Sequence, residues 1–145
     1  MKDKKIIGRD SYADFPAFGL ENVPVKVDSG AYTSTIHCAS IELNKDNVLE
    51  VVFLDKKSAA YTGEKLTFES FETRKIRSSS GQAQIRYTVK GTITLKGKTY
   101  KTLFTLSKRD KMKYPVLLGR RLLNKRFLID PSLTEVKFTN QSKKQ

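Results

Sequence analysis

The chain has 145 residues, and its 28 lysines and arginines against 15 acidic residues give a formal net charge of +13. This length fits a single domain, residues 1–145, with one core. The lone cysteine, Cys38, excludes an intramolecular disulfide. No apolar stretch is long enough for a signal sequence or a membrane span, so we expect a soluble cytoplasmic protein.

The positive charge is spread through the sequence. Such a field attracts polyanions, which include acidic polypeptides, nucleic acid, ribosomal surfaces and phospholipid headgroups. It is equally compatible with a basic surface that only keeps the protein soluble. Charge alone therefore does not choose a partner.

Alternation of apolar and polar residues predicts a protein built from strands. Ile85, Tyr87 and Val89 interleave with polar residues, as do Ile93 and Leu95. This spacing places one set of side chains on each face of a sheet. In chain order, strands are predicted at residues 23–27, 35–41, 48–54, 66–77, 84–89, 92–95, 100–106 and 127–129.

Turn signals separate these strands and favour a closed barrel. Lys96-Gly97-Lys98 predicts a hairpin turn, and Asp130-Pro131 marks a later one. The only helix expected is short, at residues 120–125, and the ends at 1–5 and 140–145 are expected to fray. Many short strands between turns indicate an all-β fold with a closed β-barrel.

The segment from Val25 to Ala31, Val-Lys-Val-Asp-Ser-Gly-Ala, places a carboxylate, Asp28, between a predicted strand and a glycine turn. That position suits acid–base chemistry, although Asp, Ser and Gly also form ordinary turns without any catalytic role. A second segment, Val116-Leu117-Leu118-Gly119-Arg120, is apolar and ends in Gly-Arg.

Together these two segments resemble the active-site loop and supporting strand of retropepsins. The chain resembles more closely a bacterial family of small retropepsin-like proteins, long labelled ATP-dependent zinc proteases and associated with RimK/LysX-type ATP-grasp ligases. The residues that carry this resemblance are Asp28 to Ser34, Arg74, Arg86, Lys108 to Asp110, Met112 and Tyr114 to Arg120. The resemblance implies an acid-protease barrel and a substrate related to glutamate tails added by a ligase.

The resemblance also implies roles for the residues of the loop. Asp28 is the catalytic carboxylate, the hydroxyl of Ser29 forms hydrogen bonds across a dimer, and Gly30 allows a close backbone approach. Ala31 lies beside the substrate. Gly119 and Arg120 support the loop from behind, although Tyr32-Thr33-Ser34 stand where retropepsins commonly supply an acidic partner for such an arginine.

An aspartic peptidase needs two carboxylates that share a proton. Only one Asp-Ser-Gly occurs in this chain, so the second carboxylate must be Asp28 of another copy across a two-fold axis. The retropepsin comparison makes the hairpin around Ser78 to Gly81 a flap that closes over substrate. The alternative is an ordinary surface hairpin whose cations keep it soluble.

Neither half of the older family label fits the sequence. The segment from Gly91 to Thr99 mimics a Walker A motif, but five residues separate its glycines where four are required. One histidine and one cysteine cannot assemble a zinc site within one chain, which leaves only a site shared between subunits through His37. We therefore expect no metal and no cofactor.

His37 and Cys38 are adjacent, which invites comparison with a thiol protease. Neighbouring residues on a strand point to opposite faces, which separates the imidazole from the sulfur. We expect one of the two side chains to be buried and the other partly exposed.

The function favoured by these observations is that of a homodimeric aspartic peptidase acting on an acidic, glutamate-rich peptide. Arg74, Arg77 and Arg86 would bind substrate carboxylates near the hairpin. One alternative is a non-catalytic basic β-domain that binds RNA or a ribosomal surface, in which exposed aromatic side chains would stack on bases. The aromatic residues considered are Tyr32, Tyr61, Phe68 and Phe71, for which core packing is the competing use. A second alternative is a remnant that binds acidic peptides without cutting them.

Overall fold

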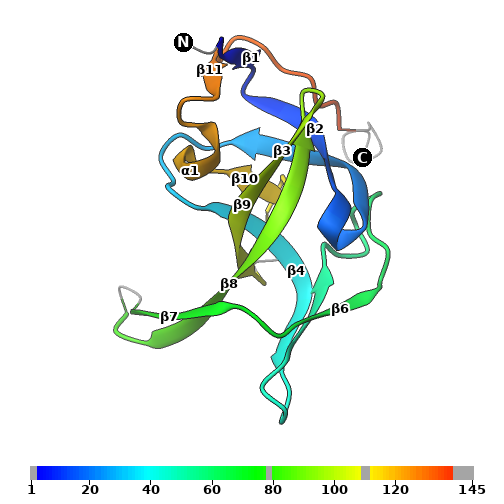
Figure 1. Ribbon diagram of the computed structural model, residues 1–145, viewed down its shortest axis with the longest axis vertical. Coiled ribbons are helices and arrows are strands. Elements are labelled where there is room, and N and C mark those ends of the chain that lie inside the picture. Colours follow the sequence, from blue (N-terminus) through cyan, green and yellow to red (C-terminus); the bar gives the residue numbers. More distant parts are fainter. Residues whose placement is uncertain (1–2, 78–79, 109–111, 139–145) are drawn as a thin grey trace.

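The computed structural model describes residues 3–77, 80–108 and 112–138. It consists mainly of strands (Figure 1). The strands are β1 (Lys5–Ile7), β2 (Asp10–Phe15), β3 (Leu20–Val27), β4 (Ser34–Leu43), β5 (Leu49–Phe53), β6 (Lys65–Phe68), β7 (Glu72–Arg77), β8 (Ala83–Leu95), β9 (Lys98–Ser107), β10 (Val116–Leu118) and β11 (Phe127–Ile129). The helical elements are the 3-10 turn η1 (Pro16–Phe18) and the helix α1 (Arg120–Leu123).

Within the described residues, six strands close into a barrel. The strand order β10-β3-β2-β8-β9-β4 returns to its start because β10 pairs with β3 in parallel and with β4 antiparallel. Strands β5 and β6 extend the sheet beyond β4, whereas β7 pairs with β8. The predicted all-β barrel with a short helix near residue 120 is confirmed.

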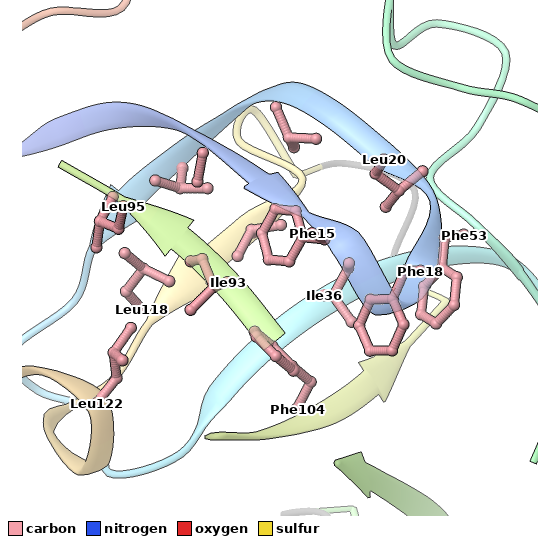
Figure 2. Close-up of a cluster of buried hydrophobic side chains, with 14 of the residues drawn as sticks. Phe15, Phe18, Leu20, Ile36, Phe53, Ile93, Leu95, Phe104, Leu118 and Leu122 are labelled. Carbon is pink, nitrogen blue, oxygen red and sulfur yellow. The ribbon is translucent and has the colours of Figure 1, made fainter. Parts of the chain in front are cut away.

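The barrel core is apolar and rich in phenylalanine (Figure 2). Phe18 stacks on Phe53 with ring centroids 4.2 Å apart, and its edge contacts Phe68 and Phe104. A Cβ atom added at Gly91 would lie 2.5 Å from Cζ of Phe18. The small residue in β8 is therefore what lets the ring of Phe18 pack against that strand.

We predict that Phe18→Ala lowers the free energy of unfolding by about 3–5 kcal/mol, because it removes a fully buried ring from this cluster. Urea denaturation followed by circular dichroism measures the change. Phe71→Ala is the matched control, since Phe71 is only partly buried and packs against Tyr87 at the edge of the core. Equal losses for the two variants would contradict this account of the core.

Turn chemistry at residues 96 and 97 is as predicted. Lys96 and Gly97 have φ values of 53° and 82° and join β8 to β9. Two consecutive positive φ values define the turn type whose twist matches a hairpin.

Several predicted boundaries are wrong for identifiable reasons. Residues 66–77 are not one strand, because β6 pairs with β5 whereas β7 pairs with β8, and the chain must cross between the two partners. Conversely, β8 runs unbroken from Ala83 to Leu95. The helix ends at Leu123 instead of Lys125, since Asn124 has φ −58° and ψ 132° and leaves the helical region.

Strands β1 and β2 were not predicted. Strand β2 begins with the buried polar residues Asp10 and Ser11, so its sequence lacks the apolar alternation that signals a strand. Lys5, placed by prediction in a frayed end, pairs with Phe127 through β1 and β11. The other predicted end, residues 140–145, lies outside the described residues.

Candidate active site

Asp28 is the first residue after β3, and backbone hydrogen bonds hold it at the mouth of a tight loop. Its N–H donates to the carbonyl oxygen of Leu118 at 2.9 Å, and its own carbonyl accepts from the N–H of Ala31 at 3.1 Å. Carboxylate oxygen Oδ1 accepts from the N–H of Gly30 at 3.1 Å. Ser29 and Gly30 are exposed beside it. The carboxylate is thus fixed in direction while one side of the loop stays open.

Gly119 supports this loop through its small size. A Cβ atom there would lie 2.6 Å from the carbonyl oxygen of Tyr32 and 2.8 Å from the carbonyl carbon of Thr33, both of them main-chain atoms. The N–H of Gly119 also donates to Oγ of Ser34 at 3.0 Å. A larger residue would push the loop away from β10, so glycine is required by this close approach.

Arg120 braces the loop through main-chain atoms. Its N–H donates to the carbonyl of Ala31 at 2.8 Å, and its guanidinium Nη1 donates to the carbonyl of Ser29 at 3.0 Å. A carbonyl oxygen therefore serves where an acidic side chain is common in retropepsins. The exposed ring of Tyr32 lies 5.8 Å from the guanidinium of Arg120 and 5.9 Å from that of Arg121, within the range of cation–π attraction.

The hairpin of β7 and β8 projects from the barrel, at the lower left of Figure 1. Residues of this hairpin line a cavity of about 560 Å³, which we call the hairpin cavity. Its lining residues are Thr33, Thr35, Glu72, Thr73, Arg74, Ile76, Arg86, Thr88, Leu103, Thr105 and Arg121. Asp28 and Ala31 are not among them. The cavity adjoins the candidate catalytic loop through Thr33 and through Arg121, which follows Arg120.

Arg74 and Arg86 face each other directly across the β7–β8 pair. Like charges in this position normally destabilise a sheet. Among the described residues, neither of them nor Arg121 forms an ion pair with a carboxylate. Three arginines therefore line one cavity with no ion-pair partner among the described residues and with Glu72 as the one acid of the described lining, an arrangement that suits an anionic ligand.

Other predicted parts of the hairpin are placed differently. Arg77 does not line the hairpin cavity, and its Nη1 donates to the carbonyl of Gly81 at 3.2 Å. Ser78 and Ser79, at the predicted flap tip, lie outside the described residues, as do Arg109 and Asp110 of the family motif. Arg121 was not identified as a cavity residue from the sequence. Its position directly after the Gly119-Arg120 segment was the one indication that the sequence offered.

His37 and Cys38 are both buried, with 6% and 1% of their surface exposed. The prediction that one of the two side chains would be partly exposed is therefore wrong. Nε2 of His37 lies 3.0 Å from Oδ2 of Asp55. Burial raises the pKa of the Cys38 thiol, which disfavours the reactive thiolate. The imidazole is therefore engaged by a carboxylate, and the thiol is not activated.

The four aromatic residues considered as base-stacking candidates fall into two groups. Phe68, Phe71 and Tyr61 pack against the core, as the competing prediction held, while 55% of the surface of Tyr32 is exposed. In the described part of the chain, no three His, Cys, Asp or Glu side chains are placed to share a metal ion. None of the helices described there has the length and apolarity needed to cross a bilayer.

Comparison with known proteins agrees with the barrel fold. Residues 6–140 match the model of the RimB-like family, described as retropepsin-like aspartic endopeptidase RimB. This chain belongs to the RimB-like family. The resemblance drawn from the two sequence segments is thereby confirmed.

Curated relatives of this RimB-like chain carry another name, probable alpha-L-glutamate ligase. The protein from Shewanella pealeana is 34% identical over 140 residues, which cover 91% of this chain and 30% of the relative. That from Desulfotalea psychrophila is 33% identical over 137 residues, covering 90% of this chain and 29% of the relative. This chain thus spans about three tenths of the length of the ligases that it matches.

A solved structure shares the fold. The crystal structure of a protein of unknown function from Legionella pneumophila superposes with a TM-score of 0.67, over 91% of this chain and 97% of that one. The two sequences are 24% identical. The likeness supports the retropepsin-like barrel.

Proposed function

We propose that this RimB-like chain is an aspartic peptidase whose active site forms between two copies, each contributing Asp28. The observation that carries the proposal is the loop itself. Two backbone hydrogen bonds fix Asp28 at the end of β3, a third from the N–H of Gly30 holds its carboxylate, and the exposed Ser29 and Gly30 leave that side open to a second copy. One loop supplies one carboxylate, and the chemistry needs two.

In the proposed reaction the two Asp28 side chains share one proton. The ionised carboxylate takes a proton from water as the water oxygen bonds to the peptide carbonyl carbon, and the other carboxyl donates its proton to the carbonyl oxygen. Collapse of the tetrahedral intermediate breaks the C–N bond, and the leaving amine receives a proton from the pair.

The substrate class is proposed from charge. Arg74, Arg86 and Arg121 line the hairpin cavity without ion-pair partners among the described residues, and the chain carries a net charge of +13. Carboxylates are natural ligands for such arginines. The relatives named as glutamate ligases support glutamate-rich peptides in particular, because the product of such a ligase carries added glutamate.

The test is a cleavage assay with two peptides of equal length, one glutamate-rich and one with glutamine at the same positions. We expect the purified protein to cut only the acidic peptide, with a specific activity that rises with protein concentration as dimers form. Mass spectrometry of the products identifies the broken bond. Failure to cut either peptide at any concentration would contradict the proposal, and RNA binding without cleavage would favour the non-catalytic basic domain.

A further inference from the structure

A second cavity adjoins the hairpin cavity on the outside of the barrel. It has a volume of about 670 Å³, and we call it the outer groove. Its lining residues are Ala17, Glu72, Lys90, Gly91, Thr92, Lys101, Thr102, Leu103, Arg121 and Arg126. Glu72, Leu103 and Arg121 line both cavities. The outer groove therefore borders the proposed substrate site.

The floor of both cavities is one face of the β8–β9 pair. Thr88 pairs with Thr105, Lys90 with Leu103, and Thr92 with Lys101. Since alternate residues share a face, these six side chains form a single row on the outside, while Val89, Ile93 and Phe104 are buried on the other face. From residue 88 to residue 92 the row is about 13 Å long, enough for about four residues of an extended peptide.

The outer groove is strongly basic. Lys90, Lys101, Arg121 and Arg126 line it, against the single acid Glu72. In the described part of the chain none of these four cations is paired with a carboxylate. Arg126 is already held in place, because its Nη1 donates to the carbonyl of Leu122 at 3.0 Å and its guanidinium lies 5.5 Å from the ring centroid of Tyr100. A polyanion would gain several charge contacts here.

The lining also indicates which polyanion fits. The lining residues that the structure describes include no aromatic side chain, so they offer no platform for stacking the bases of a single strand. The threonines of the groove provide hydroxyl groups and Leu103 an apolar side chain for an extended peptide. The groove shares Glu72, Leu103 and Arg121 with the hairpin cavity, so one extended peptide could occupy both.

We infer that the outer groove is an extended binding site for an acidic polypeptide, which holds glutamates several residues away from the bond that is cut. This inference rests on the proposed function for its substrate class. It adds that recognition depends on the length of the acidic segment. Long glutamate tails fill both cavities, whereas short ones reach only the hairpin cavity.

The test compares fluorescently labelled oligo-glutamate peptides of three and ten residues, with binding measured by fluorescence anisotropy. The variant is Lys90→Gln/Lys101→Gln. We expect its affinity for the ten-residue peptide to fall about three- to tenfold, because two surface charge contacts are lost, with little change for the three-residue peptide. Lys45→Gln/Lys56→Gln removes the same charge from exposed positions elsewhere and is the matched control.

Equal losses in the two double variants would overturn the inference, since net charge alone would then explain binding. A loss that is the same for short and long peptides would overturn it as well, as would preferential binding of a single-stranded RNA of similar charge. Failure of the proposed function gives a different result from failure of this inference. If binding depends on the groove but no peptide is cut, the peptidase proposal fails and the extended site stands. If cleavage is unaffected by the Lys90 and Lys101 changes, the extended site fails and the peptidase proposal stands.

Discussion

Asp28→Asn should lower the rate of cleavage of a glutamate-rich peptide by about a thousandfold or more, because neither subunit then supplies a base to activate water. The amide can still accept the N–H of Gly30 through its oxygen, so the loop should keep its shape. Cleavage rates measured by mass spectrometry, with circular dichroism to confirm folding, test this expectation. Asp46→Asn, at an exposed turn, makes the same change in charge and should leave the rate unaltered.

The same variant also tests whether the active site is shared. Excess Asp28→Asn protein added to the wild type should reduce activity, since mixed dimers carry only one ionisable carboxylate at the site. Activity that is unchanged by mixing would indicate that each chain works alone. Full activity of the variant by itself would remove Asp28 from the mechanism.

A second large effect is expected at Asp10, a buried carboxylate that the sequence did not single out. With 1% of its surface exposed, it accepts hydrogen bonds from the hydroxyls of Tyr114 at 2.6 Å and Thr134 at 2.9 Å. It also accepts from the N–H groups of Glu135 at 2.7 Å and Val136 at 3.1 Å. This one side chain joins β2 to the C-terminal segment and to the residue that precedes Pro115 and β10.

We predict that Asp10→Ala lowers the free energy of unfolding by at least about 3 kcal/mol, because it leaves several buried donors without an acceptor. Urea denaturation measures the loss. Asp10→Asn, which keeps an acceptor oxygen for the N–H groups of Glu135 and Val136, should lose less. A loss from Asp10→Ala of under about 1 kcal/mol would be too small for a buried carboxylate with these partners.

Ionisation of Asp10 gives this prediction a pH dependence. Burial opposes the charged form, but the hydrogen bonds from Tyr114, Glu135, Val136 and Thr134 together outweigh it and hold the pKa of the carboxyl below its ordinary value of 3.8. Burial and the hydrogen bond to Asp10 raise the pKa of Tyr114 to about 12, so its hydroxyl stays a donor at neutral pH. The stabilisation by Asp10 is therefore present above pH 3.8 and is lost as the pH falls through the lowered pKa. The stability difference between wild type and Asp10→Asn should shrink over that range.

The sequence allowed prediction of those parts of the site that depend on local order along the chain. Asp28, Ser29 and Gly30 are consecutive, so the turn that aims the carboxylate forms locally, with Asp28 accepting from the N–H of Gly30. The Lys96-Gly97 turn could be predicted because Gly97 readily adopts the positive φ that this hairpin turn requires. The Gly119-Arg120 segment was identified through its resemblance to the retropepsin pattern, and it contacts the loop by main-chain atoms.

The sequence did not reveal features that depend on which strands become neighbours. Strand β7 separates from β6 because each pairs with a different partner, and the sequence of residues 66–77 carries no mark of that change. Arg121 lines the hairpin cavity because α1 turns it toward β8 and β9. The buried acceptor role of Asp10 depends on residues more than a hundred positions away.

By itself, then, the sequence determined the barrel class, because alternation and turn chemistry act over a few residues, and its resemblance to the retropepsin pattern indicated the family and the candidate catalytic aspartate. Only the tertiary structure decided how cations from three separate segments line one groove, and which of them lack a carboxylate among the described residues. The physical reason is that charge and hydrogen-bond complementarity act through space, between residues that are distant in the sequence and that only the folding of the chain brings together.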